Sequence, residues 1–410
     1  MKRRISKAIL FAVKLLVAGV LLAWVVSQVH WRDYVQTHDG QTYSVVEPVK
    51  GLSPEGMVPV DEGSWWAGRV KFRPISDFAP VAEAEGGGDI VRPGFATSLS
   101  QIDPLLASAG VVAFGLALLL IALRWRMLLK IQDVEISLWE ATRLTFLGQF
   151  FNSIVPGTVG GDLVKAYYVA KHTPKTAAVI VSVFVDRLLG LIELALMAGA
   201  MLVLLLLGMG GPDQPDHIGE ELFLPAVCVA IILPAVAGMM LFLLSRRFRH
   251  FFRLDRIYSR LSIAHHIEAA GDAAVQYRQR LGAMAGAVGI SALSHLAFVA
   301  FVALMGMSLS IPAGWMEYFL YVPLIYIIGA IPLTPGGVGW VENWYLRFFH
   351  ATGGASTILV LALLARLVPM LWGLPGAIVA VTGPRLPKSD VIEAELAAEQ
   401  CRAKADTESE

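Results

Sequence analysis

Charged residues are scarce in this sequence. Asp, Glu, Lys and Arg make up 16% of its 410 residues, against about 25% in a typical soluble domain. The formal net charge is zero, so no general attraction to nucleic acid is expected. Hydrophobic residues reach 56%. This composition excludes an ordinary soluble enzyme, and it excludes disorder over most of the chain.

Cysteine is nearly absent. Cys228 lies in an apolar run and Cys401 in a polar tail, so a disulfide framework, a zinc site and a thiol redox motif are all excluded. The sequence contains no Gly-x-x-x-x-Gly-Lys-Ser/Thr loop, which excludes the common ATP-binding motif. We therefore predict no metal and no cofactor.

Long apolar runs dominate what is present. A membrane-spanning helix needs roughly 20 predominantly apolar residues. Six stretches meet this requirement: Ile9–Val29, Pro104–Leu123, Ala177–Leu207, Leu222–Ser245, Leu281–Met316 and Thr357–Val381. The first, within 1–30, lacks a small-x-small cleavage site and is predicted to be an uncleaved anchor helix. The sequence predicts an all-α polytopic membrane protein.

The distribution of Lys and Arg predicts the orientation of these spans. Basic residues gather at 2–7, 124–130 and 246–280, whereas the loops 208–220 and 309–315 have none. Because basic loops stay in the cytoplasm, both termini are predicted to be cytoplasmic. We expect a multi-pass protein of the plasma (bacterial inner) membrane.

Three polar regions flank the spans. Residues 31–104 are predicted to form a small extracytoplasmic β-rich insert, because Thr42–Val46 and 66–73 favour strands; the alternative is an ordered loop without its own fold. A Gly-rich linker is expected at 85–89. Residues 246–280 fit an amphipathic surface helix or a plain basic loop. The tail 384–410 is predicted to be disordered and cytoplasmic.

An internal repeat is the most informative signal. Pro-Gly-Thr-Val-Gly at 156–160 corresponds to Pro-Gly-Gly-Val-Gly at 335–339, and each pentapeptide is followed by an acidic residue, Asp162 or Glu342. The distance from Pro156 to Arg187 is 31 positions, as it is from Pro335 to Arg366. Both arginines lie in otherwise apolar runs, so the repeat predicts two equivalent sites.

Each repeat lies in an apolar segment broken by Pro and Gly, 141–172 or 316–350. With the predicted orientation, the first segment enters and leaves on the cytoplasmic side and the second on the outer side. We therefore predict two re-entrant helical hairpins as an inverted repeat of about 105–207 and 282–382, a plan that recurs in transporters. Together these residues form a predicted transmembrane domain at 105–383.

The turns predict a site for an anionic group. Helix N-termini near Gly161 and Gly339 offer free N–H donors and a partial positive charge, which suit a phosphate. An arginine within the membrane needs a partner; Asp186, Glu193 and Glu342 are internal candidates and a lipid phosphate is an external one. The predicted substrate-binding residues are Asn152, Pro156, Gly157, Gly160, Gly161, Asp162, Lys165, Asp186, Arg187, Thr334, Pro335, Gly336, Gly337, Gly339, Glu342 and Arg366.

Each of these interpretations has a structural alternative. The Pro-Gly turns could join short helices of a packed bundle, and the two acidic residues could only complement helix dipoles. Arg187 and Asp186 could form a structural ion pair. His295, with Ser291 and Ser294, indicates hydrogen bonding between helices more than a proton relay.

The motifs around the two turns carry a resemblance to a known family. Phe-Asn-Ser-Ile-Val-Pro-Gly-Thr-Val-Gly-Gly-Asp-Leu-Val-Lys (151–165), Val-Asp-Arg-Leu-Leu-Gly (185–190), Pro-Leu-Thr-Pro-Gly-Gly-Val-Gly-Trp-Val-Glu (332–342) and Ala-Arg-Leu (365–367) resemble the transmembrane, flippase-like domain of lysylphosphatidylglycerol synthases over roughly 105–382. The resemblance implies handling of a polar-headed lipid. Lys165 departs from the arginine often found there, and no aminoacyl-transferase domain is expected after Gly383, so synthase activity is not carried over.

Three functions follow as hypotheses. The first is an integral membrane protein that translocates or binds a polar-headed phospholipid between leaflets without ATP, its partner being a lipid with an anionic or phosphate head group. The alternative is a membrane-embedded lipid-modifying transferase or its accessory subunit. The third is a scaffold that binds an envelope protein through the insert 31–104. A homo-oligomer is compatible with all three.

Overall fold

The computed structural model describes residues 16–17, 19–39, 41–45, 57–61, 70–78, 91–154, 160–171, 173, 175–209, 222–244, 276–277, 279–331 and 333–382. Several predictions fall outside these residues: most of the N-terminal anchor helix, the linker at 85–89, nearly all of the surface stretch 246–280 and the tail 384–410.

Four helices are long and apolar enough to cross a membrane: α3 (Pro104–Ile131), α6 (Thr176–Leu206), α12 (Leu281–Ser308) and α15 (Ala355–Thr382). They confirm four of the predicted spans. A fifth prediction coincides with α8 (Phe223–Leu244), of which Phe223–Gly238 counts as a shorter apolar helix. Residues 19–27 of the first predicted span are helical. The chain is a multi-pass, mostly helical membrane protein.

Each broken apolar segment forms two short helices. The first contains α4 (Leu138–Ile154) and α5 (Gly160–Ala170), and the second contains α13 (Trp315–Gly329), the 3-10 turn η3 (Pro335–Gly337) and α14 (Trp340–Phe348). At 1.5 Å per residue the longest of these, α4 with 17 residues, measures about 25 Å. That is less than the roughly 30 Å of a hydrocarbon core.

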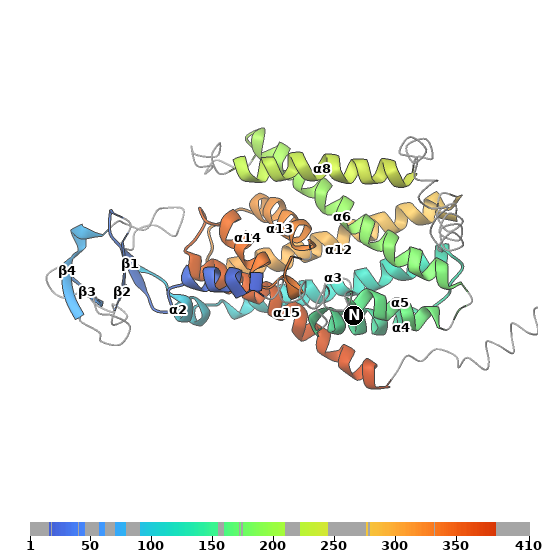
Figure 1. The fold of residues 1–410 in the computed structure, drawn as a ribbon, viewed down its shortest axis with the longest axis horizontal. Coiled ribbons are helices and arrows are strands. Elements are labelled where there is room, and N and C mark those ends of the chain that lie inside the picture. The colour runs from blue at the N-terminus through green and yellow to red at the C-terminus, as the bar shows by residue number, and fades with distance from the viewer. Residues whose placement is uncertain are drawn as a thin grey trace, which may run out of the picture. The chain divides into compact units, whose positions relative to one another are not determined.

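The helices within each pair pack against each other. α4 and α5 lie side by side (Figure 1), and the carbonyl oxygen of Gly148 occupies the space where a side chain of Gly161 would begin. In the second pair the indole of Trp340 donates to the carbonyl of Ile328 at 3.1 Å. Glycine is therefore required where α5 meets α4.

The two halves of the chain share one order of helices. The first half has 28, 17, 11 and 31 residues in α3, α4, α5 and α6. The second half has 28, 15, 9 and 28 residues in α12, α13, α14 and α15. A long helix, two short helices and a second long helix thus occur twice.

The insert contains a five-stranded antiparallel sheet in the order β4-β3-β2-β1-β5. The strands are β1 (Tyr34–Gln36), β2 (Thr42–Val45), β3 (Met57–Asp61), β4 (Val70–Pro74) and β5 (Val91–Arg92), followed by helix α2 (Phe95–Ser100). β2 and β4 confirm the two predicted strands. A small core of Val35, Val45, Val58, Val60 and Phe78 covers one face, so the insert has a β-rich fold.

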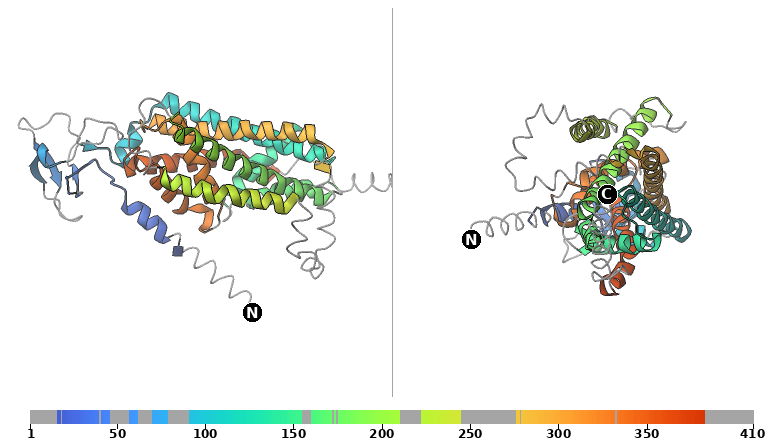
Figure 2. Two further views of the ribbon diagram at one scale, coloured as in Figure 1. Left: turned by 90° about the horizontal axis from the view of Figure 1, so that it is seen from above. Right: turned by 90° about the vertical axis from the view of Figure 1, so that its right-hand side faces the viewer.

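The chain divides into two compact units. The first comprises 1–114, 194–233 and 297–368, and the second comprises 115–193, 234–296 and 369–410. α12 runs beside α3 (Figure 2): in the first unit Phe114 contacts Phe301, with ring centroids 5.2 Å apart, and in the second a Cβ on Gly286 would lie 3.0 Å from Met127. The second unit also holds a core around Trp125 and Leu144.

Candidate functional site

The start of α5 is fixed by its contact with α4. The N–H of Gly161 donates to Asn152 Oδ1 at 2.8 Å, which satisfies one of the free donors of the helix N-terminus. Because Gly161 lies against Gly148, the first turn of α5 is held close to α4. This places the next residue, Asp162, in the interior with its side chain 6% exposed.

Asp162 joins two cations. Its Oδ1 lies 3.0 Å from Lys165 Nζ, and its Oδ2 accepts a hydrogen bond from Arg187 Nη2. Lys165 is buried and its ammonium lies 4.6 Å from the centre of the Trp125 ring, a cation–π contact. Arg187 differs from the buried Asp162 and Lys165 because its side chain is 47% exposed.

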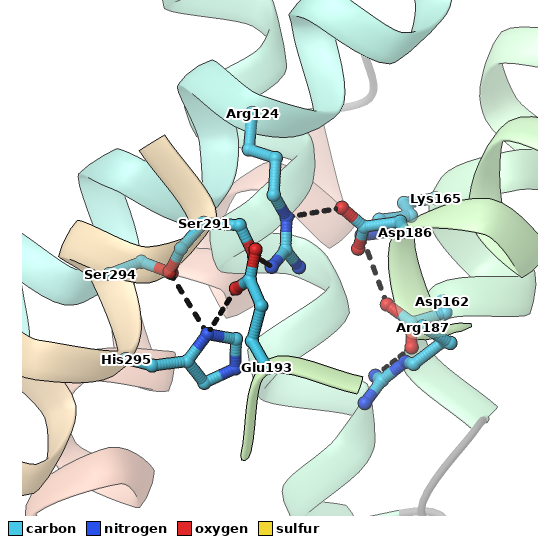
Figure 3. Close-up of polar contacts among 9 residues, drawn as sticks. All are labelled: Arg124, Asp162, Lys165, Asp186, Arg187, Glu193, Ser291, Ser294 and His295. Atoms are coloured by element: carbon cyan, nitrogen blue, oxygen red, sulfur yellow. Dashed lines mark hydrogen bonds and ion pairs between the residues drawn. The ribbon is translucent and has the colours of Figure 1, made fainter. Parts of the chain in front are cut away.

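A second aspartate continues this cluster. Asp186 Oδ1 accepts a hydrogen bond of 2.7 Å from Arg124 Nε, and both side chains are buried. Arg124 Nη1 donates to Ser291 Oγ at 2.5 Å. Asp186 is the chain neighbour of Arg187 in α6, so these contacts run from the residue beside Arg187 to α12 (Figure 3). We name Arg124, Asp162, Lys165, Asp186 and Arg187 the α5 cluster.

The second turn forms another ion pair in the first unit. Glu342, in the first turn of α14, accepts from Gly339 N–H at 2.8 Å and from Arg366 Nε at 2.7 Å. Arg366 also donates from Nη1 to the carbonyl of Gly336 at 2.8 Å and from Nη2 to that of Gly337 at 3.2 Å. The three glycines have positive φ angles of 64°, 69° and 76°, which other residues rarely adopt.

The two arginines therefore have different environments. Arg366 uses all three of its nitrogens to hold the turn and the helix start. Among the described residues, Arg187 has Asp162 as its one hydrogen-bonding partner. Since a guanidinium carries five N–H donors, Arg187 retains donors for a further anion.

The N-terminal segment contacts the second turn. A Cβ on Gly339 would lie 2.8 Å from the backbone nitrogen of Leu22 and 2.9 Å from the Cβ of Leu21. Both residues belong to the helical part of the first predicted span. The helical residues 19–27 therefore pack against the start of α14.

The structure brings most of the predicted residues into these two groups. Asn152, Gly161, Asp162, Lys165, Asp186 and Arg187 belong to the first, and Gly336, Gly337, Gly339, Glu342 and Arg366 to the second. Pro156 and Gly157 lie outside the described residues, and Gly160 begins α5. Pro335 opens η3, and Thr334 is buried with no partner for its hydroxyl among the described residues.

The partners of the arginines are partly as predicted. Arg366 pairs with Glu342, one of the expected internal partners. Arg187 pairs with Asp162 rather than with Asp186. Adjacent positions on a helix point about 100° apart, which turns Asp186 toward Arg124. Glu342 both caps its helix and binds the arginine, so the two roles considered for it coexist.

Arg124 was not predicted as a site residue, because it was counted among the cytoplasmic basic residues that set orientation. A signal was present in the sequence. The apolar pattern continues beyond it through Trp125, Leu128 and Leu129, which are all fully buried. A charge inside such a pattern is buried with it and requires a partner.

Similarity to known proteins agrees with this geometry. Residues 94–376 match the family described as the lysylphosphatidylglycerol synthase TM region, which covers more than half of the chain. The chain belongs to this family. It is also similar to a UPF0104 membrane protein of Methanothermobacter thermautotrophicus, with 34% identity over 82 residues, 20% of this chain and 22% of that protein. This family membership confirms the predicted resemblance and is consistent with a role involving membrane lipids.

The described residues form no group suited to holding a metal ion. No group of three or more His, Cys, Asp or Glu side chains is placed there to hold a metal ion. The acidic residues of both groups are instead engaged by cations. The arrangement is suited to binding an anion.

Proposed function

We propose that this protein binds the anionic head group of a phospholipid at the α5 cluster and moves the lipid between leaflets without ATP. The observation that carries this proposal is the half-exposed side chain of Arg187. Its guanidinium is anchored to a buried carboxylate and has further donors left. A lipid phosphate supplies the acceptors that those donors need.

The charges of the α5 cluster support the same ligand. Arg124, Lys165 and Arg187 carry three positive charges, and Asp162 and Asp186 carry two negative ones. One positive charge is left over. An uncompensated charge is expensive inside a membrane, so a phosphodiester with one negative charge stabilises the cluster when it binds.

In this proposal the second turn has a structural task. Arg366 uses three donors on Glu342 and on two carbonyl oxygens, so more of its guanidinium is engaged by the protein than that of Arg187. Arg366 holds the carbonyl oxygens of Gly336 and Gly337, and its partner Glu342 caps the helix at Gly339.

The repeated order of helices supports an inverted repeat. Among the described residues, one further apolar helix, α8, lies between the two halves along the chain. If α8 crosses the membrane, the second half begins on the opposite side from the first, and the two pairs of short helices enter from opposite sides as re-entrant hairpins. Both termini are then cytoplasmic, as the basic residues indicate.

Lipid movement in proteoliposomes tests this function. Purified protein is reconstituted with labelled phosphatidylglycerol, and the label reaching the outer leaflet is measured over time. Arg187→Ala is expected to slow the movement at least tenfold, the rough effect of losing one charge-assisted contact. Arg347→Ala is the control, because Arg347 is exposed on α14 and contacts neither group.

The outcomes separate the hypotheses. If Arg187→Ala moves lipid as fast as the wild type, the proposed site is wrong. Mass spectrometry of the same lipids adds a second test, since a lipid that has been covalently changed would indicate a transferase instead.

One observation favours a further role for the insert. β4 is an edge strand of the sheet, and Val70 and Phe72 on it are 48% and 60% exposed. An exposed apolar edge can pair with an extended segment of another protein. We propose an envelope protein as that partner; replacing Phe72 with Lys should abolish its capture and leave lipid movement unchanged.

A further inference from the structure

A histidine and a glutamate meet next to the α5 cluster. His295 Nδ1 on α12 lies 3.0 Å from Glu193 Oε2 on α6, with the two side chains 14% and 10% exposed. The same nitrogen lies 2.9 Å from the backbone carbonyl of Ser291. Figure 3 shows the imidazole between these two acceptors.

The contacts assign a proton to one ring nitrogen. A carbonyl oxygen can only accept a hydrogen bond, so Nδ1 of His295 carries hydrogen and donates. The second carboxylate oxygen of Glu193, Oε1, is buried and has no hydrogen-bond partner among the described residues. A buried carboxylate with one unsatisfied oxygen is unfavourable when ionised. One more proton bound at Oε1 would remove the charge of this buried carboxylate.

The pair is connected to the α5 cluster. Ser291 accepts from His295 through its carbonyl and from Arg124 through its hydroxyl. Arg124 in turn binds Asp186, the neighbour of Arg187 in α6. A change of charge at the pair is therefore felt at the proposed lipid site, since electrostatic interactions are weakly screened in a buried environment.

Charge balance decides the direction of the coupling. Without the extra proton the pair carries one negative charge, which neutralises the single positive charge left in the α5 cluster. With the proton bound, the pair is neutral and the cluster again carries one positive charge. An anionic lipid restores neutrality, so the proton and the lipid bind best together.

We propose that Glu193 and His295 form a proton-binding site and that one proton is taken up with each anionic lipid bound at the α5 cluster. This inference rests on the proposed function. It identifies a proton gradient as a driving force for lipid movement. Among the described residues of the second unit, the charged groups that face the pair are Arg124 from α3 and Asp186 from α6, with Lys165 and Asp162 of α5 beyond them.

Proton uptake on lipid binding is the test. Purified protein in a weakly buffered detergent solution with a pH indicator is titrated with short-chain phosphatidylglycerol, and lipid binding is measured in parallel by calorimetry. The wild type should take up about one proton per lipid, and its affinity should fall up to about tenfold per pH unit above the pKa of the pair.

Variants locate the proton. Glu193→Gln has the shape of the protonated acid but does not titrate, so it should bind the lipid without proton uptake and independently of pH. His295→Gln should also lose the uptake. His350→Gln is the matched control, because His350 is exposed and, in the part of the chain that the structure describes, its ring bonds to one backbone carbonyl; it should behave as the wild type.

The outcomes are distinct. If the wild type binds phosphatidylglycerol without taking up a proton, or if uptake persists in both Glu193→Gln and His295→Gln, the inference is wrong and the lipid site stands. If the wild type binds no phosphatidylglycerol at any pH from acidic to alkaline, the proposed function and the inference both fail.

Discussion

Arg366 donates from Nε to Glu342 at 2.7 Å, and its two terminal nitrogens bind the carbonyl oxygens of Gly336 and Gly337. One guanidinium therefore ties the start of α14 to the turn that precedes it. Arg187 forms the corresponding pair with Asp162 but retains donors. The repeat thus contains the same ion pair twice, with three hydrogen bonds from Arg366 and one from Arg187 among the described residues.

Replacing Arg366 with Lys should destabilise the protein. A single ammonium keeps the charge, but it cannot reach Glu342 and both carbonyl oxygens with the geometry of the planar fork. We expect a loss of about 1–3 kcal/mol in the free energy of unfolding, measured by denaturation in detergent. Arg347→Lys on the exposed face of α14 is the control. Equal stability of Arg366→Lys and the wild type would show that the turn needs only a charge.

Gly161→Ala should disrupt the contact between α4 and α5. The added methyl group would overlap the carbonyl of Gly148, and overpacking of this kind destabilises by about 1–3 kcal/mol or more. Gly282→Ala is the matched control, because its Cβ would meet nothing within 4 Å and alanine favours a helix. The midpoint of thermal unfolding should fall for Gly161→Ala and stay unchanged for Gly282→Ala. Similar midpoints for the two variants would contradict a close contact between α4 and α5 at Gly161.

Arg124 and Asp186 should be strongly coupled. Both are buried, so Arg124→Met or Asp186→Asn alone leaves a buried charge unpaired and should cost about 3–5 kcal/mol. The double variant should lose less than the sum of the two single losses. A double-mutant cycle on unfolding measures this coupling, and additive effects would place the two residues apart.

An exposed ion pair outside the spans should show a pH dependence. The hydrogen bond from Arg280 Nη2, 2.6 Å long, lowers the pKa of the Asp133 carboxyl, with smaller contributions from the charges of Arg280 and Lys175. A carboxyl whose pKa is lowered by folding contributes stability at neutral pH and loses it as the pH falls through its folded pKa. Asp133→Asn should therefore be less stable than the wild type at neutral pH and equally stable in acid. If the difference in stability between Asp133→Asn and the wild type persists in acid, the effect does not come from the charge of Asp133.

Much of the fold follows from the sequence because the membrane restricts the choices. Spans such as that of α12 are recognised by length and composition, and the short helices by the Pro and Gly that interrupt them. The sequence predicts only some of the strands in the sheet of the insert. β2 and β4 show strand patterns, whereas the two-residue β5 is too short to show any pattern.

The sequence predicts which residues belong to the candidate site better than it predicts which of them are in contact. The equal spacing from each turn to its arginine identifies Arg187 and Arg366. The directions in which side chains leave α6 decide that Asp186 pairs with Arg124 and that Arg187 pairs with Asp162. Such pairings depend on which helix faces which. That information lies in tertiary packing rather than in sequence spacing, as does the meeting of His295 with Glu193.

A density map of the protein in a lipid disc containing phosphatidylglycerol tests the central claim most directly. The account predicts a head-group phosphate within hydrogen-bonding distance of the Arg187 guanidinium, on the side away from Asp162, and its loss in Arg187→Ala. Ordered lipid that lines the helices while Arg187 binds only protein atoms or water would contradict the account.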